Sequence, residues 1–163
     1  MQYSSMDVDL GRFKATEEAL RASQSLLRLV LDTIPVRVFW KDTQSRYLGC
    51  NRAFAKDAGL PTTAAVTGLL DEDMPWTENA ELYRADDRTV MCDGGGARID
   101  VERPLIDAHG VQHWLETTKV PLVDAQGAVI GVLGTFHDIT ERHQKLRELN
   151  TLAAAFTTGT GPR

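Results

Sequence analysis

Apolar residues at helical spacing mark the N-terminal part of the chain. The stripe is formed by Leu20, Leu27, Leu31 and Ile34. Residues three, four or seven apart share one face of a helix, so this pattern predicts a helix over residues 16–34, which Thr16 can cap and Pro35 ends. Residues 1–15 are polar without a clear period, and we expect them to be flexible.

The middle of the chain has the β-branched and aromatic composition of strands. Residues 36–41 and 46–50 enclose a polar turn and predict a hairpin. Three further strands are predicted over residues 97–106, 111–123 and 128–138, joined by turns that contain Asp and Gly.

Helices are expected between the two groups of strands. Asn51 can cap a short helix over residues 52–58, and Thr77 can cap a longer one that ends at Gly94. The order of elements indicates an α+β fold, in which a five-stranded antiparallel sheet carries small helices on one face. We expect this core to span residues 35–138.

A final helix is predicted over residues 139–156, before a flexible tail at 157–163. The segment Asp138-Ile139-Thr140-Glu141 places a capping residue three positions before a glutamate, as in a capping box. A short coiled-coil seam is formed by Ile139, Leu146, Leu149, Ala153 and Phe156.

Composition narrows the function classes. The chain has 163 residues, 42% of them apolar and 25% charged, which is typical of one globular domain. Its net charge of -5 argues against nucleic-acid binding and against docking on an anionic membrane. No membrane-spanning apolar run and no secretory signal are visible, so we expect a cytoplasmic protein. Cys50 and Cys92 lack CxxC companions and are interpreted as buried thiols of a reducing compartment.

Motifs of catalysis are missing from the sequence. There is no nucleophile elbow, zinc-protease motif, P-loop or dinucleotide fingerprint, and Gly94-Gly95-Gly96 precedes a strand rather than a helix. The chain is therefore predicted not to be an enzyme. Asp71-Glu72-Asp73 could hold a divalent cation, but helix capping and solvation are the favoured interpretation, and no metal site is predicted. Asp86-Asp87 is interpreted as part of an exposed helix face.

Four groups of residues, in order along the chain, resemble the PAS superfamily. They are Val38-Phe39-Trp40-Lys41-Asp42 with Tyr47-Leu48-Gly49-Cys50-Asn51-Arg52-Ala53-Phe54-Ala55, then Asp71-x-Asp73-x-Pro75-Trp76, then Thr118-Lys119-Val120-Pro121-Leu122, then Gly134-Thr135-Phe136-His137-Asp138-Ile139-Thr140-Glu141-Arg142. The last is similar to the G-x-x-x-DIT-E-R ending with which bacterial PAS domains pass to their output helix. The resemblance covers Leu26 to Arg142.

The resemblance implies a bacterial sensory module of signal transduction. Such a module binds a small ligand or cofactor in a cup between sheet and helices, and relays its state through the C-terminal helix to an output domain or partner such as a histidine kinase or diguanylate cyclase. A ligand-free dimerisation or relay module is the alternative. The resemblance also implies a homodimer through the N-terminal helix and the outer sheet face. It places Trp114 on that face, covered by the N-terminal helix or by a partner subunit. The residues expected to transfer the signal are Asp138, Ile139, Thr140, Glu141, Leu146 and Leu149.

Alternation by two, together with the resemblance, selects candidates for the cup. On the last three strands they are Val101, Arg103, Leu105, Leu115, Thr117, Gly134 and Phe136, and the wall is completed by Phe39, Phe54, Met74, Trp76, Tyr83 and Met91. Gly134 leaves room for close approach of a ligand or backbone. Two interpretations of Arg103 are open. It pairs with a carboxylate or phosphate of a ligand, or it pairs with Glu102, Glu116 or an acidic loop residue at the rim. The second interpretation is favoured, because surface ion pairs are common.

The sequence does not identify a cofactor. Cys50 is followed by Asn-Arg-Ala-Phe-Ala, and Leu115 and Phe136 stand where light-sensing members carry polar residues, which argues against flavin photochemistry. Non-covalent binding of a flavin by Trp76 and the aromatic wall stays an open alternative. Residues 77–93 contain no histidine for haem. The surface imidazoles are expected to be His109, His113, His137 and His143. The favoured expectations are that the cup binds a small metabolite or that it binds no ligand.

Overall fold

The computed structural model describes residues 5–92, 99–106 and 110–158. The chain divides into two compact units, Met1–Pro35 and Val36–Arg163. The predicted glycine stop at 94–96, the turn with His109, and the tail from residue 159 lie outside the described residues.

The first unit consists of one long helix, α1 (Ser5–Thr33). Residues 5–15, expected to be flexible, belong to this helix, which begins before the predicted start at Thr16. Thr16 does not cap the helix, because its hydroxyl donates to the Arg12 carbonyl oxygen one turn earlier (2.9 Å). The helix continues because the apolar stripe does, with Met6, Leu10 and Phe13.

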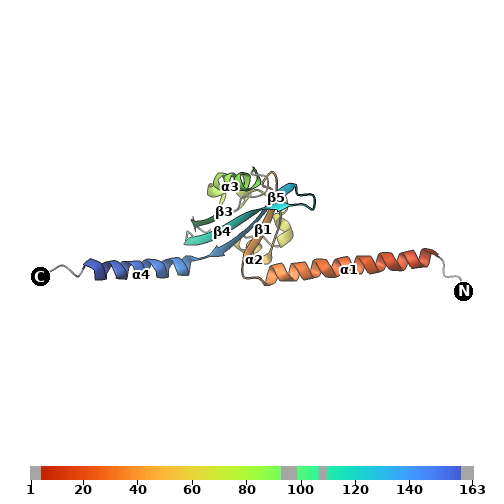
Figure 1. Ribbon diagram of the computed structural model, residues 1–163, viewed down its shortest axis with the longest axis horizontal. Coiled ribbons are helices and arrows are strands. Elements are labelled where there is room, and N and C mark those ends of the chain that lie inside the picture. Colours follow the sequence, from red (N-terminus) through yellow and green to blue (C-terminus); the bar gives the residue numbers. More distant parts are fainter. Residues whose placement is uncertain (1–4, 93–98, 107–109, 159–163) are drawn as a thin grey trace. The chain divides into compact units, whose positions relative to one another are not determined.

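The second unit is built on a five-stranded antiparallel sheet with the strand order β2-β1-β5-β4-β3 (Figure 1). The strands are β1 (Arg37–Asp42), β2 (Tyr47–Cys50), β3 (Ile99–Ile106), β4 (Gln112–Val123) and β5 (Val129–Asp138). Although β5 is last in the sequence, it pairs with both β1 and β4 and joins the two groups of strands. The predicted α+β class and the antiparallel sheet are confirmed.

Short helices connect β2 to β3. They are α2 (Arg52–Asp57), α3 (Ala80–Cys92) and the 3-10 helices η1 (Thr63–Val66), η2 (Asp71–Asp73) and η3 (Thr77–Asn79). Asn51 caps α2 as predicted, because its Oδ1 accepts from the Phe54 backbone N–H (3.1 Å). The same oxygen accepts from the Val38 N–H (3.1 Å), which ties the start of α2 to β1.

Burial alternates along β3 as the sequence predicts. In β3, residues 99, 101, 103 and 105 are half-buried and their neighbours are exposed. One core cluster lies between this face of the sheet and the connecting helices. Its large members are Phe39, Tyr47, Phe54, Val66, Met74, Trp76 and Phe136. The inner face of the sheet is thus the place where a cup can form.

The last strand leads into α4 (Thr140–Thr158). Asp138 Oδ1 accepts from the backbone N–H of Thr140 (2.9 Å) and from its hydroxyl (2.5 Å). Glu141 pairs with Lys145 (2.5 Å) instead of completing the predicted capping box. Ile139 is buried, whereas Leu146, Leu149 and Phe156 of the predicted seam are exposed.

The two cysteines differ in environment. Cys50 is buried, but Cys92 is exposed, so the prediction of two buried thiols is wrong for Cys92. The physical reason is position, since Cys92 ends α3 beyond the buried Val90. Among the helices described, none combines the length and apolar character that a bilayer crossing requires.

Candidate ligand-binding cavity

A cavity of about 400 Å³ lies between the inner face of the sheet and the connecting helices. Its apolar wall is formed by Phe39, Phe54, Trp76, Leu105, Leu115 and Phe136. The aromatic rings pack against one another at tilted or edge-to-face angles, with the Phe54 and Trp76 centroids 5.5 Å apart. Ligand sites in proteins start at about 300 Å³, so this space is large enough for a small molecule.

Eight of the predicted cup residues line this cavity. They are Phe39, Phe54, Trp76, Tyr83, Leu105, Leu115, Thr117 and Phe136. The structure brings them together from β1, α2, α3, the last three strands and the segment between η2 and η3, which holds Trp76. Five other candidates do not line it, namely Met74, Met91, Val101, Arg103 and Gly134. Met74 belongs to the core cluster instead.

Gly134 makes room for a side chain rather than for a ligand. A Cβ atom at this position would lie 2.1 Å from Cζ of Phe39. The two residues face each other across β5 and β1. The missing side chain therefore lets the Phe39 ring lie flat over the sheet.

Arg103 has a partner that neither sequence interpretation named. Its guanidinium holds the Asp86 carboxylate of α3 through two contacts, of 2.5 and 3.2 Å. Asp86 and Asp87 are both buried, so their assignment to an exposed helix face is wrong. The reason is that α3 packs on the sheet with this pair inward, where Arg103 and the lysines below supply opposite charges.

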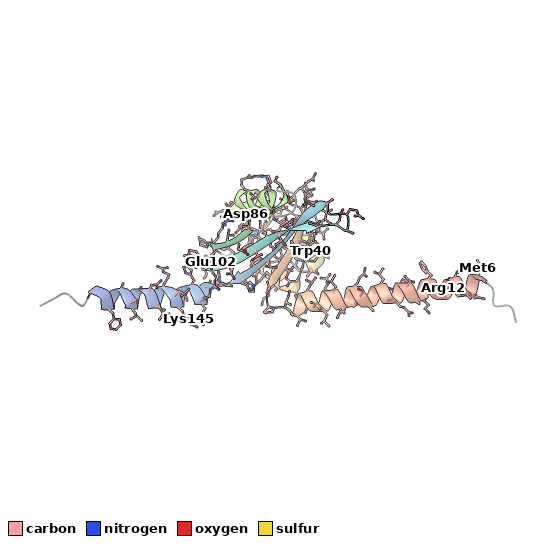
Figure 2. The ribbon with its side chains drawn as sticks, in the orientation of Figure 1. Met6, Arg12, Trp40, Asp86, Glu102 and Lys145 are labelled. Atoms are coloured by element: carbon pink, nitrogen blue, oxygen red, sulfur yellow. The ribbon has the colours of Figure 1, made fainter. Side chains whose placement is uncertain are left out.

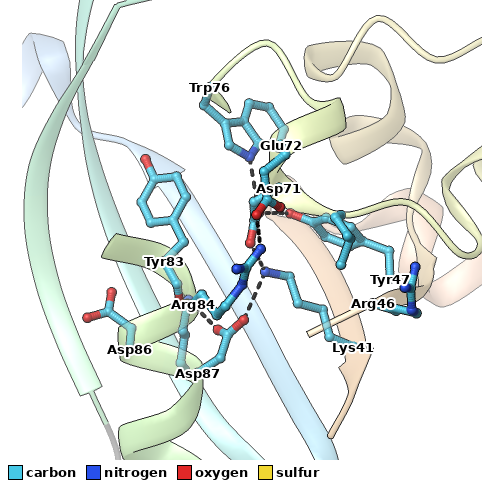
Figure 3. Close-up of polar contacts among 12 residues, drawn as sticks. Lys41, Arg46, Tyr47, Asp71, Glu72, Trp76, Tyr83, Arg84, Asp86 and Asp87 are labelled. Atoms are coloured by element: carbon cyan, nitrogen blue, oxygen red, sulfur yellow. Dashed lines mark hydrogen bonds and ion pairs between the residues drawn. The ribbon is translucent and has the colours of Figure 1, made fainter. Parts of the chain in front are cut away.

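A buried ionic network forms the polar end of the cavity (Figure 3). The ammonium group of Lys41 on β1 contacts Asp71 Oδ2 (2.5 Å) and Asp87 Oδ2 (3.0 Å). Lys119 on β4 holds the other oxygen of Asp87 and donates to the Tyr83 carbonyl (2.9 Å). All four charged side chains are at most 3% exposed. Two lysines and two aspartates thus balance each other within the core.

Asp71 has further donors around it. Tyr47 donates its hydroxyl to Asp71 Oδ1 (2.6 Å), and the Trp76 indole N–H donates to the same atom (3.3 Å). The interpretation of the acidic segment as solvated is therefore wrong for Asp71. It holds for Asp73, which accepts from the Leu70 backbone N–H (2.9 Å) as a cap. Glu72 pairs with Arg84.

Burial and pairing shift the pKa values of these groups. Burial, followed by the nearby Asp71 charge, raises the pKa of Tyr47 well above its ordinary value. Burial would raise the pKa of Asp87, but the charges of Lys41 and Lys119 outweigh it and lower that pKa. Burial lowers the pKa of Lys119, and Asp87 opposes this effect. Asp87 is therefore held as a carboxylate between two ammonium groups.

The sequence contained one overlooked signal for this network. Lys41 stands two positions after Phe39, and Lys119 two after Thr117, so alternation places both lysines on the inner face. A charged residue on such a face needs a buried partner. The identity of the partners, Asp71 and Asp87, could not be found from the strands alone.

The mouth of the cavity is charged and leads to α4. Arg37 pairs with Asp57 (2.8 Å) there, and His113 Nδ1 lies 2.9 Å from Asp138 Oδ2. Both pairs line the opening, so His113 is not an ordinary surface imidazole. Asp138 also receives the two bonds from Thr140 described above. One carboxylate thus belongs both to the cavity rim and to the start of α4.

The outer face of β4 contacts the first turn of α4. The Trp114 and His143 rings are stacked, with centroids 3.9 Å apart and planes 12° apart. Arg142 bridges Glu102 (2.8 Å) and Glu116 (3.3 Å) of β3 and β4. Trp114 is therefore covered by α4, and His143 is half-buried rather than a surface imidazole. His137 is exposed as predicted.

Among the described residues, no three His, Cys, Asp or Glu side chains are grouped so that they could hold a metal ion. The acidic segment cannot form such a group because its members point to different partners, Asp71 to Lys41 and Glu72 to Arg84.

Comparisons with known proteins point to sensors. The virulence sensor protein BvgS of Bordetella bronchiseptica is 28% identical over 143 residues, and the match covers 84% of this chain but 11% of BvgS. The aerobic respiration control sensor protein ArcB of Escherichia coli is 30% identical over 124 residues, covering 72% of this chain and 15% of ArcB. The chain therefore spans only a small part of the length of these relatives.

Solved structures show the same fold. The Vibrio cholerae VqmA dimer in the absence of target DNA has a TM-score of 0.65 and 26% identity, covering 72% of this chain and 52% of that one. VqmA bound to DPO has a TM-score of 0.63 and 26% identity over 69% of this chain and 57% of that one. The PAS domain of Bordetella pertussis BvgS has a TM-score of 0.56 and 25% identity, covering 83% and 98%.

The family model described as PAS fold matches residues 31–144, which include the whole sheet, the connecting helices and the first turn of α4. With the five-stranded antiparallel sheet and the similarity to sensor proteins, this match shows that the chain belongs to the PAS-fold family and is a PAS domain homologous to those of sensor histidine kinases.

Proposed function

We propose that this domain is a non-catalytic cytoplasmic sensor that binds a small molecule in the cavity and relays its occupancy through α4. The output would be a domain of the same protein or a partner such as a histidine kinase or diguanylate cyclase. The observation that carries the proposal is the position of Asp138, which lines the cavity and also accepts from Thr140 at the start of α4. A ligand at the mouth would touch the group that fixes the output helix.

The electrostatics of Asp138 support this role. Burial would raise the pKa of Asp138, but its bonds to Thr140 and His113 outweigh burial and lower that pKa. Asp138 is therefore ionised at neutral pH and shared between His113 at the cavity rim and Thr140. A ligand that draws His113 away would weaken one side of this arrangement.

The similarity to known sensor proteins also supports ligand binding and relay. The relatives are named as sensors and sensor kinases, and one of the structurally similar proteins is VqmA bound to DPO. That protein is bound to DPO, and here the same fold has a cavity of about 400 Å³.

A matched pair of tryptophan variants tests the proposal. Leu115→Trp fills the cavity from β4, and Leu122→Trp places the same ring on the same strand outside the cavity lining. Native mass spectrometry of the wild type and a library screen by thermal shift would identify bound molecules. We expect Leu115→Trp to abolish binding and Leu122→Trp to retain it.

Relay is measured separately by amide hydrogen exchange in residues 140–150. Occupancy of the cavity should change protection of the first turns of α4, because Asp138 and Thr140 connect the two. Leu115→Trp, as a permanent occupant, should produce the same change and Leu122→Trp should not. Unchanged exchange with a bound ligand would refute the relay.

A second candidate function, a ligand-free dimerisation and relay module, is favoured by the exposed side of α1 (Figure 2). Apolar residues at three- and four-residue spacing are exposed there, namely Met6, Leu10, Phe13, Leu20 and Leu27. This spacing is that of a coiled-coil seam, which a second copy of α1 would cover. Sedimentation equilibrium would show a dimer that Leu20→Glu dissociates, and a wild-type monomer would exclude this mode of assembly.

A further inference from the structure

The buried network offers hydrogen-bond donors to a ligand. A lysine ammonium has three N–H donors. Among the described residues, Lys41 uses two of them on Asp71 and Asp87, and Lys119 uses two on Asp87 and the Tyr83 carbonyl. Both lysines line the cavity, so each has one further proton for a molecule inside it.

The two spare donors lie close together. Lys41 and Lys119 bind the two oxygens of one carboxylate, that of Asp87. The four oxygens of Asp71 and Asp87 each accept at least one bond already, from the two lysines, Tyr47 and Trp76. The edge of a ligand that meets the two ammonium groups must therefore carry acceptors, because a donor group there would face ammonium protons.

Charge balance restricts the ligand further. The formal charges of Lys41, Lys119, Asp71 and Asp87 sum to zero, and all four side chains are buried. An anionic ligand would leave a net negative charge away from water, and a cationic one a net positive charge. An uncharged ligand accepts the two protons without disturbing the balance.

The walls favour a flat molecule. Phe39, Phe54, Trp76 and Phe136 surround the apolar part of the cavity, and aromatic rings bind other rings by stacking or edge contacts. At about 30 Å³ for each water molecule in the liquid, the 400 Å³ cavity has the space of roughly 13 waters, which fits a compound of one or two rings.

Resting on the proposed function of the same cavity, we infer that its ligand is an uncharged planar ring compound with two adjacent acceptors, carbonyl oxygens or ring nitrogens, held by Lys41 and Lys119. Carboxylates and amines built on the same ring should bind more weakly, because their charge is not balanced by the network. The inference names a chemical class that the fold by itself does not fix.

Matched probes on one scaffold test this class. Nicotinamide, nicotinate and 3-(aminomethyl)pyridine share a ring and differ in charge, and quinoline-3-carboxamide with quinoline-3-carboxylate adds a two-ring pair. Ligand-observed NMR titration would measure each affinity. We expect each carboxamide to bind about tenfold or more tightly than its carboxylate and than the amine. Equal or tighter binding of the carboxylates, or no binding by either carboxamide, overturns the inference.

A charge-neutral double variant tests the lysine itself. Lys119→Met alone would leave Asp87 short of a partner, so it is combined with Asp87→Asn, while Lys41 keeps its contact with Asp71. We expect about a tenfold loss of carboxamide affinity in the double variant. Lys145→Met, an exposed lysine of α4, is the control and should bind as the wild type does. Full affinity in the double variant contradicts the assignment of Lys119.

Different results would contradict ligand binding in the cavity and the assigned chemical class of the ligand. If native mass spectrometry finds no molecule, the library gives no binder and Leu115→Trp changes nothing, then the proposed function of the cavity is wrong. If a molecule does bind and is lost in Leu115→Trp but is charged, then only the assignment of the ligand class is wrong.

Discussion

Asp87→Asn would remove the negative charge that lies between two buried ammonium groups. Asp87 is 0% exposed, and its two oxygens accept from Lys41 and Lys119. Lys41 retains Asp71, but Lys119 keeps only the Tyr83 carbonyl among the described residues. The variant therefore leaves one buried ammonium without a counter-charge.

The expected loss follows from this geometry. Removing one partner of a buried ion pair destabilises a protein by about 3–5 kcal/mol, a large part of the roughly 5–15 kcal/mol that holds a typical domain together. Adding Lys119→Met removes the orphaned charge, so the double variant should return to within about 2 kcal/mol of the wild type. The surface pair of Arg37 and Asp57 provides the control, and Asp57→Asn should cost about 1 kcal/mol or less.

Urea unfolding at pH 7, followed by far-UV circular dichroism, measures the free energy of unfolding of five proteins: the wild type, Asp87→Asn, Lys119→Met, the double variant and the control Asp57→Asn. The double-mutant cycle then gives the coupling energy between Asp87 and Lys119. A loss in Asp87→Asn no greater than that in Asp57→Asn would refute the view that the network holds uncompensated charges away from water. A double variant as unstable as Asp87→Asn would refute the pairing with Lys119.

Three further predictions test other parts of the domain. Gly134→Ala should lower the free energy of unfolding by about 1–3 kcal/mol, because its Cβ would lie 2.1 Å from the Phe39 ring. Thermal unfolding measures this loss, and an unchanged melting temperature would contradict the prediction. The raised pKa of Tyr47 means that above about pH 10 the folded protein holds a proton that the unfolded chain has lost, so stability should fall as pH rises. In Tyr47→Phe, the free energy of unfolding measured with urea should decrease less between pH 9 and 11 than in the wild type. An equal decrease would show that a group other than Tyr47 causes it. Trp114→Ala removes the ring stacked on His143, worth about 0.5–1.5 kcal/mol, and should speed amide exchange at the start of α4; wild-type exchange would show that the stack does not hold the helix.

The sequence determined the strands, the cap at Asn51 and the family. Alternation by two gave the inner face of β3, since each strand residue points opposite to its neighbour whatever the sheet packs against. Asn51 could be recognised as a cap because its bond to Phe54 spans three residues. These features depend on neighbours in the chain, and a local pattern is enough to find them. Eight of the cavity residues followed from the same alternation and from the resemblance.

Only the tertiary structure decided which polar residues are buried together. Lys41 and Asp87 are 46 positions apart, and Lys119 and Asp87 are 32 apart. An aspartate on α3 has the same local pattern whether it faces water or a lysine, so Asp87 read as an exposed residue until the packing of α3 on the sheet was known. The same holds for Trp114, whose cover by His143 depends on where α4 lies. Burial of a charge is a property of the assembled layers, because the opposite charge that compensates for its desolvation comes from a distant segment.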